Sequence, residues 1–101
     1  MEGIALLVLV TYDVAITTNG GAARLRRVAK ICEQYGVRVQ NSVFECIVDA
    51  TQKKRLEMDL MKVIDQQSDS IRIYQLGNQY RNKVNHIGAK ETLNVEDPLI
   101  F

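Results

Sequence analysis

A run of aliphatic residues near the N-terminus, within residues 4–12, most constrains what this chain can fold into. The run lacks the polar gaps that a helical period of 3.6 residues would leave, so it predicts a β-strand. Because both of its faces are apolar, the strand is expected to be buried on both sides and central in its sheet. It leads directly to a carboxylate, Asp13, at the point where the strand should end.

A helix is expected after this strand. Apolar side chains recur at spacings of three and four while charged residues fill the rest of each turn, which is typical of an amphipathic helix. Gly36 follows directly and is a common residue at helix ends, where it adopts the left-handed conformation. The apolar stripe of this helix comprises Leu25, Val28, Ala29, Cys32 and Tyr35.

Three more strands and a second helix complete the pattern. The segments 37–40 and 43–48 are extended runs joined by a tight turn, and the second run is apolar on both faces. Asp49 and Gln52 have the spacing of a capping box, which predicts that a helix begins there. Residues 70–76 alternate between apolar and polar side chains and indicate a last strand.

The resulting order, β, α, β, β, α, β, predicts a ferredoxin-like α+β fold over residues 1–76. This fold has a four-stranded antiparallel sheet with both helices on one face. The other face of the sheet would be bare and apolar, and the simplest cover for it is a second copy of the same sheet. We therefore expect a homodimer formed through the sheet face.

The C-terminal segment, residues 77–101, differs in character from the rest of the chain. It is polar and lacks a long hydrophobic period, so we expect a tail rather than a second domain. Residues 86–89 indicate a short edge strand, which predicts a fifth strand laid across the partner's sheet. The last four residues, 98–101, are apolar, and we expect this end to dock on the dimer.

Composition limits the functional classes. A chain of 101 residues, 47% of them hydrophobic and 25% charged, suits one compact domain. The apolar run at 4–10 is too short to span a bilayer and has no basic flank like that of a signal peptide, so a cytoplasmic protein without a membrane partner is expected. The two cysteines form no CxxC motif, which predicts buried thiols rather than metal ligands or a disulfide.

The net charge of +1 is unevenly distributed. Residues 22–40 carry five cationic side chains and one acidic side chain, so this segment could meet a polyanion, although a simply solvated helix face is the alternative. Arg38 differs because it lies on a strand among apolar neighbours, where its guanidinium must meet a carboxylate such as Glu45 or a phosphate. The single histidine, His86, is expected to be structural.

Asp13 admits two interpretations. An aspartate after a strand commonly stabilises a turn, and one carboxylate alone is a poor site for a hard cation. Two copies of Asp13 across a dimer axis would do better, because together they could hold a Mg²⁺ or Mn²⁺ ion that activates water and offsets charge on a phosphate.

Tyr12 is most simply a core aromatic, and no strand shows the paired exposed aromatics of an RNA recognition motif.

Three segments together resemble the CRISPR-associated protein 2 family, and the central one looks closest to members from type I-C systems. They are Tyr12–Asp13, LRRVAKICEQYGVRVQNSVFEC at 25–46, and DSIRIY at 69–74. The resemblance implies a prokaryotic homodimer that acts in spacer adaptation, binds duplex DNA or RNA, and bridges copies of the CRISPR integrase. It also implies a metal-dependent endonuclease that hydrolyses phosphodiesters with Mg²⁺ or Mn²⁺.

By position, the resemblance assigns Asp13 to the metal site and to catalysis, with Tyr12 beside it in the same motif. Arg24, Arg27 and Arg38 become candidates for nucleic-acid contacts. The neutral loop ITTNGG and the two alanines after it depart from the more charged loops of other members, which implies weaker binding of metal or nucleic acid. A ferredoxin-like regulatory or RNA-binding module without catalysis is the alternative outside this family.

Overall fold

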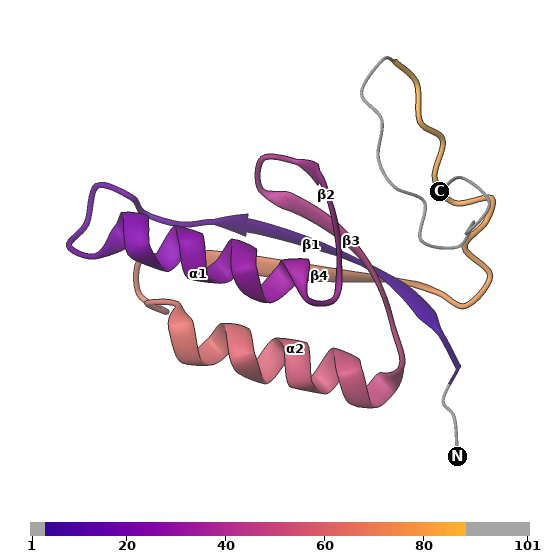
Figure 1. The fold of residues 1–101 in the computed structure, drawn as a ribbon, viewed down its shortest axis with the longest axis horizontal. Helices are drawn as coiled ribbons and strands as arrows, with labels where there is room; N and C mark the ends of the chain where they lie inside the picture. Colours follow the sequence, from indigo (N-terminus) through magenta and orange to yellow (C-terminus); the bar gives the residue numbers. More distant parts are fainter. Residues whose placement is uncertain (1–3, 89–101) are drawn as a thin grey trace.

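The computed structural model describes residues 4–88, and its elements follow the predicted order (Figure 1). They are β1 (Leu6–Asp13), α1 (Gly21–Glu33), β2 (Gly36–Gln40), β3 (Val43–Val48), α2 (Ala50–Val63) and β4 (Ser70–Gly77). The predicted sequence of strands and helices is therefore confirmed. No helix in this part of the chain is long and apolar enough to cross a membrane.

The four strands form one antiparallel sheet in the order β2-β3-β1-β4. β1 lies between β3 and β4, as its two apolar faces predicted. Both helices lie on one side of the sheet (Figure 1), which confirms the ferredoxin-like arrangement. The register places Val10 opposite Phe44 on β3 and opposite Ile73 on β4, and these side chains face the helices.

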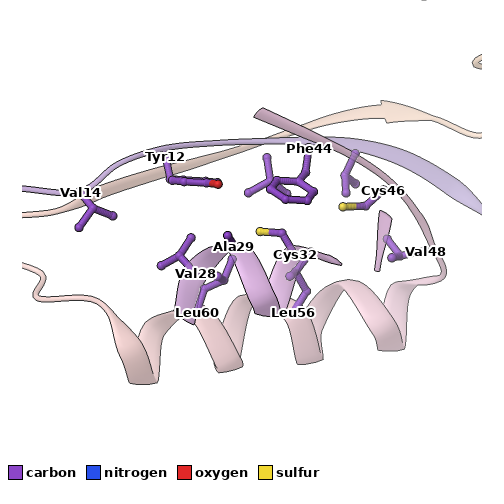
Figure 2. Close-up of a cluster of buried hydrophobic side chains, with 12 residues drawn as sticks. Tyr12, Val14, Val28, Ala29, Cys32, Phe44, Cys46, Val48, Leu56 and Leu60 are labelled. Atoms are coloured by element: carbon purple, nitrogen blue, oxygen red, sulfur yellow. The ribbon is translucent and has the colours of Figure 1, made fainter. Parts of the chain in front are cut away.

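The hydrophobic core fills the layer between the sheet and the helices (Figure 2). Alternate residues of β1 and β3 point into this layer and meet the apolar stripes of α1 and α2. Phe44, Leu56 and Leu60 are the largest side chains that are almost fully buried. Cys32 and Cys46 are free thiols inside this layer, as predicted.

The other face of the sheet has no helix over it in the part of the chain that the structure describes (Figure 1). The register places Leu9 opposite Glu45 on β3 and opposite Tyr74 on β4, all on this face. Val43 and Ile47 share it and are only partly buried. This mixture of apolar and polar groups suits an interface, and the homodimer stays a prediction.

Gly36 does not end the first helix, so that prediction is wrong. α1 ends at Glu33, and Gly36 is the first residue of β2, with a φ outside the left-handed region. Glycine is required there for a different reason. A Cβ at this position would overlap the carbonyl oxygen of Glu45 and lie 2.7 Å from the Cα of Cys46. The missing side chain lets β2 approach β3 closely.

Beyond β4 the chain turns toward the side of the sheet that lacks helices (Figure 1). The fifth strand predicted at 86–89 is not formed over residues 86–88, and residue 89 lies outside the described residues. A strand needs a neighbour to pair with, and this one is predicted to lie on a second copy, so it stays a prediction for the dimer. The apolar end at 98–101 also lies outside the described residues. The division into a domain at 1–76 and a tail at 77–101 likewise stays a prediction.

Candidate functional site

Asp13 is the last residue of β1, and it is exposed. Its cross-strand partner is Ser70 on β4, and Thr11 lies two residues earlier on the same face of the sheet. This is the face without helices. Asp13 therefore stands at the rim of the surface predicted to form the dimer, where its carboxylate can meet solvent, a cation or a second copy.

Tyr12 lies on the opposite face, because successive strand residues point to opposite sides. Its ring packs against Phe44 with the centroids 6.2 Å apart, and its hydroxyl donates a hydrogen bond to the carbonyl oxygen of Asn41 at 3.2 Å. Burial raises the pKa of this hydroxyl, so it stays protonated at neutral pH. The structure does not bring Tyr12 together with the Asp13 carboxylate. These contacts favour a structural role, and a catalytic one stays a prediction.

A buried ion pair connects α1 to the start of β4. The Nε of Arg24 donates to Oδ2 of Asp69 at 2.8 Å, and its Nη2 donates to Oδ1 at 3.3 Å. Asp69 also accepts the backbone N–H of Ala15 at 3.0 Å and that of Asp65 at 2.9 Å. The side chain of Asp69 is 0% exposed and that of Arg24 is 12% exposed. The guanidinium of Arg24 is thus engaged inside the protein, and its contact with nucleic acid stays a prediction that these bonds do not support.

Sequence reasoning misses Asp69 as a residue of this site. Its one signal is its place directly before Ser70, the residue that pairs with Asp13 across the sheet. An acid at that point must lie beside the end of β1 once the two strands pair. The cation that meets it, however, is 45 positions away in the sequence, and only the folded chain brings the two together.

The pKa of Asp69 is held at about 2, below the ordinary 3.8, and the hydrogen bond from Arg24 is the largest cause. A carboxylate with a lower pKa in the folded chain stabilises the fold above the unfolded pKa and loses that contribution as the pH falls. From about pH 4 to about pH 2, the free energy of unfolding should therefore decrease more steeply for the wild type than for Asp69→Asn. Urea titrations across this range measure the difference, and equal pH dependence would show that the pair does not form in solution.

Arg27 is exposed on α1, and its contact with nucleic acid stays a prediction. Arg26 and Lys30 are also exposed. Lys30 lies three positions from Arg27 and four from Arg26, so the three cations occupy neighbouring places on one side of the helix. They form the cationic face of α1, the name used below for these three residues. No hydrogen bond or ion pair engages their side chains within residues 4–88.

Arg38 has a different environment. Its Cζ lies 5.3 Å from the centroid of the Phe44 ring, in a cation–π contact. The register pairs Arg38 with Phe44 and Val37 with Glu45, so Arg38 and Glu45 are on opposite faces of the sheet. Of the two partners expected for Arg38, the Glu45 carboxylate is therefore excluded. Its exposed position leaves a phosphate contact as a prediction.

The residues described here do not assemble a metal site within one chain. Residues 4–88 contain no group of three or more His, Cys, Asp or Glu side chains placed to hold an ion. The carboxylate oxygens of Asp13 are the ligand type that Mg²⁺ and Mn²⁺ prefer, but several such ligands are needed, so a second copy would have to contribute. Burial raises the pKa values of Cys32 and Cys46 to about 12, so neither thiol is a ready nucleophile or metal ligand at neutral pH.

The chain matches the family described as CRISPR associated protein Cas2 over residues 6–84. It is 60% identical over 96 residues to the CRISPR-associated endonuclease Cas2 of Halalkalibacterium halodurans, a match that covers 95% of this chain and 100% of that protein. It is 51% identical over 97 residues to the CRISPR-associated endoribonuclease Cas2 of Nitratidesulfovibrio vulgaris, which covers 96% of this chain and 95% of that one.

A solved structure shows the same fold. The crystal structure of Streptococcus pyogenes Cas2 at pH 6.5 superposes with a TM-score of 0.71 at 49% sequence identity, over 81% of this chain and 99% of that chain. The sheet order, the two helices on one face and the extent of these matches confirm the resemblance found in the sequence. The chain belongs to the Cas2 family of CRISPR-associated proteins.

Proposed function

We propose that this protein acts in CRISPR spacer adaptation, as a homodimer that binds duplex nucleic acid and bridges copies of the CRISPR integrase. The observation that carries the proposal is the cationic face of α1, Arg26, Arg27 and Lys30. Membership of the Cas2 family supports the CRISPR context. A type I-C origin belongs to the same proposal and rests on the central block of the sequence, residues 25–46.

The cationic face of α1 suits the backbone of a duplex. Three neighbouring cations on one side of a helix can reach successive phosphates, and phosphate contacts position a protein on a duplex without reading its bases. Each contact releases counterions from the nucleic acid, so the affinity should fall steeply with salt concentration. A homodimer presents two copies of this face and gains affinity from engaging both.

The sheet face without helices supplies the dimer surface in this proposal. Partly buried Leu9 and Ile47 and exposed Tyr74 give it the apolar and aromatic groups that are typical of interface centres. A two-fold axis through this face would bring the same patch of both copies together. The helices, which lie on the other side of each sheet, would then remain outside the interface and accessible to nucleic acid (Figure 1).

The salt dependence of duplex binding tests this proposal. The logarithm of the association constant for a short DNA duplex should fall linearly with the logarithm of salt concentration, and Arg27→Gln should reduce the slope by about 1 per copy of the chain. Fluorescence anisotropy measures both quantities. Arg55→Gln, which changes an exposed arginine on α2, is the matched control and should leave the slope unchanged.

Three results would contradict the assignment. An affinity that is the same at low and high salt would remove the phosphate contacts on which the proposal rests. A dimer without affinity for nucleic acid at any salt concentration would favour a ferredoxin-like regulatory module instead. Equal slope changes in Arg27→Gln and Arg55→Gln would show that binding is not centred on α1.

A second candidate function is metal-dependent phosphodiester hydrolysis, which the exposure of Asp13 at the rim of the predicted dimer surface favours. Two relatives carry the names endonuclease and endoribonuclease. The two Asp13 carboxylates of a dimer would hold Mg²⁺ or Mn²⁺, and such an ion supplies an activated water and stabilises charge on a phosphate. The chain's own part is to fix both carboxylates at the rim of the sheet, where a phosphodiester can reach them.

A further inference from the structure

Asp69 lies at a junction of four elements of the fold. Its Oδ1 accepts from the backbone N–H of Ala15, just past β1, and from Nη2 of Arg24 on α1. Its Oδ2 accepts from Nε of Arg24 and from the backbone N–H of Asp65, just past α2. Asp69 itself directly precedes β4. Each carboxylate oxygen therefore accepts two hydrogen bonds. The carboxylate connects the end of β1, the first turns of α1, the end of α2 and the start of β4.

This junction brackets Asp13 on both sides. Ser70, the neighbour of Asp69, is the cross-strand partner of Asp13. Ala15, which donates its backbone N–H to Asp69 in a hydrogen bond, is only two residues beyond Asp13 along the chain. A displacement of Asp69 would therefore reach the backbone of Asp13 by two routes, through the strand pairing and through the peptide that follows β1.

Arg24 extends the junction into the loop at residues 14–20. Its Nη1 donates to the carbonyl oxygen of Asn19 at 2.9 Å, and its Nη2 donates to the hydroxyl of Thr18 at 2.7 Å. The loop is also tight against the helix, because a Cβ at Gly21 would overlap the carbonyl oxygen of Ala15 and lie 2.7 Å from the Cα of Ile16. The guanidinium thus ties the carboxylate to several points along one short loop.

Burial makes this arrangement sensitive to a single change. The carboxylate of Asp69 is 0% exposed, so water cannot replace a partner that is lost, and buried polar groups without partners are costly. The other ion pair in the described residues, Lys53 with Glu57, has side chains that are 24% and 31% exposed and lies along one face of α2. A pair that water still reaches contributes little, so this one offers a comparison for the buried pair.

We propose that Asp69 and Arg24 form a positioning pair, which fixes the Val14–Ala15 peptide just beyond Asp13 and thereby sets where the Asp13 carboxylate stands at the rim of the sheet. This inference rests on the proposed role of Asp13 in phosphodiester hydrolysis. Its consequence is that the loop at 14–20 moves as part of each protomer. A change in the distance between two Asp13 carboxylates then requires movement of whole protomers rather than of this loop.

Asp69→Asn, with Glu57→Gln as control, tests the positioning pair. An asparagine places an NH₂ against two N–H donors whichever way its amide is turned, so the junction should open while the shape of the side chain is kept. Amide hydrogen exchange in residues 15–20 should accelerate by about tenfold or more, whereas core amides such as that of Val10 should change by less than about twofold. Cleavage of a duplex should fall by about tenfold in kcat with KM unchanged. Glu57→Gln should change none of these.

Arg24→Lys is a second test of the positioning pair, for the case in which Asp69→Asn does not fold. A lysine retains one cation for Asp69 but cannot also reach Asn19 and Thr18, so exchange should accelerate in residues 18–20 more than at Asp65. Unchanged exchange in the loop would overturn the positioning pair, and so would uniform acceleration that includes Val10, which indicates a general loss of stability. Accelerated amide exchange in the loop together with a wild-type rate of duplex cleavage would also overturn it.

Failure of the proposed hydrolysis is distinguishable from these outcomes. A wild-type protein that cleaves nothing, or whose cleavage survives Asp13→Asn, would refute the proposed role of Asp13. The exchange measurement alone would then decide whether Asp69 and Arg24 fix the Val14–Ala15 peptide.

Discussion

Asp13→Asn is expected to reduce metal-dependent cleavage of a nucleic-acid duplex by about 100-fold or more. The change keeps the shape of the side chain but removes the negative charge that a divalent cation requires. A bound cation supplies several kcal/mol of charge stabilisation to such a reaction, and each tenfold in rate corresponds to about 1.4 kcal/mol. The measurement is the initial rate of cleavage of a labelled duplex with Mg²⁺ or Mn²⁺, for both proteins at equal concentration of folded protein.

The same substitution should leave the fold almost unchanged. Asp13 is exposed, and no hydrogen bond or ion pair engages its side chain within residues 4–88. Its replacement should alter the free energy of unfolding by less than about 0.5 kcal/mol, which urea denaturation can verify. Glu33→Gln, which neutralises another exposed acid on α1, controls for the loss of one charge and should retain activity. Cleavage that survives Asp13→Asn, or survives chelation of the metal, would place the nuclease elsewhere.

The layers of this fold could be predicted from the sequence because they depend on local periodicity. The two apolar faces of β1 indicated a central strand, and the register confirms that β3 and β4 flank it. The capping box of Asp49 and Gln52 forms as its spacing predicted, with both reciprocal hydrogen bonds present. Signals of this kind involve residues within a few positions of each other, so a linear pattern contains all the information needed.

The environment of each arginine could not be predicted in the same way. Arg24 and Arg27 belong to the same basic segment, but one is paired with a buried carboxylate 45 positions away and the other is exposed. Arg38 lies over an aromatic ring because of the register between β2 and β3, which no pattern within β2 specifies. Charge alone marks a candidate for phosphate binding. The fold decides which candidates are free to bind.

Gly36 shows how one residue type can satisfy two local patterns. A glycine directly after an amphipathic stretch is typical of a helix end, where left-handed φ favours it. Here the same glycine is needed because β2 comes so close to the backbone at Glu45 that no side chain fits. Only the pairing of β2 with β3 distinguishes the two explanations, and that pairing is a tertiary contact.

Phe44→Ala is expected to destabilise the protein by about 3–5 kcal/mol, the range found for removal of a large buried aromatic side chain. The Phe44 ring is 0% exposed and stacks on Tyr12, and its centroid lies 5.3 Å from the Cζ of Arg38. Its removal deletes all of these contacts and leaves a cavity under the centre of the sheet. For a domain of this size such a loss is a large part of the total stability, and urea denaturation at neutral pH measures it.

Phe44→Leu separates packing from the aromatic contacts, because leucine refills much of the volume but cannot stack on Tyr12 or accept the Arg38 cation on its face. Its destabilisation should therefore be smaller than that of Phe44→Ala but not zero. If the ring fixes the position of Arg38, both Phe44 variants should also lower duplex affinity under conditions where they remain folded. Leu60→Met, a volume-conserving change elsewhere in the core, is the control and should leave duplex affinity unchanged. A destabilisation of Phe44→Ala below about 1 kcal/mol would contradict the central place of this ring in the core, since neighbouring side chains would then have filled the space without cost.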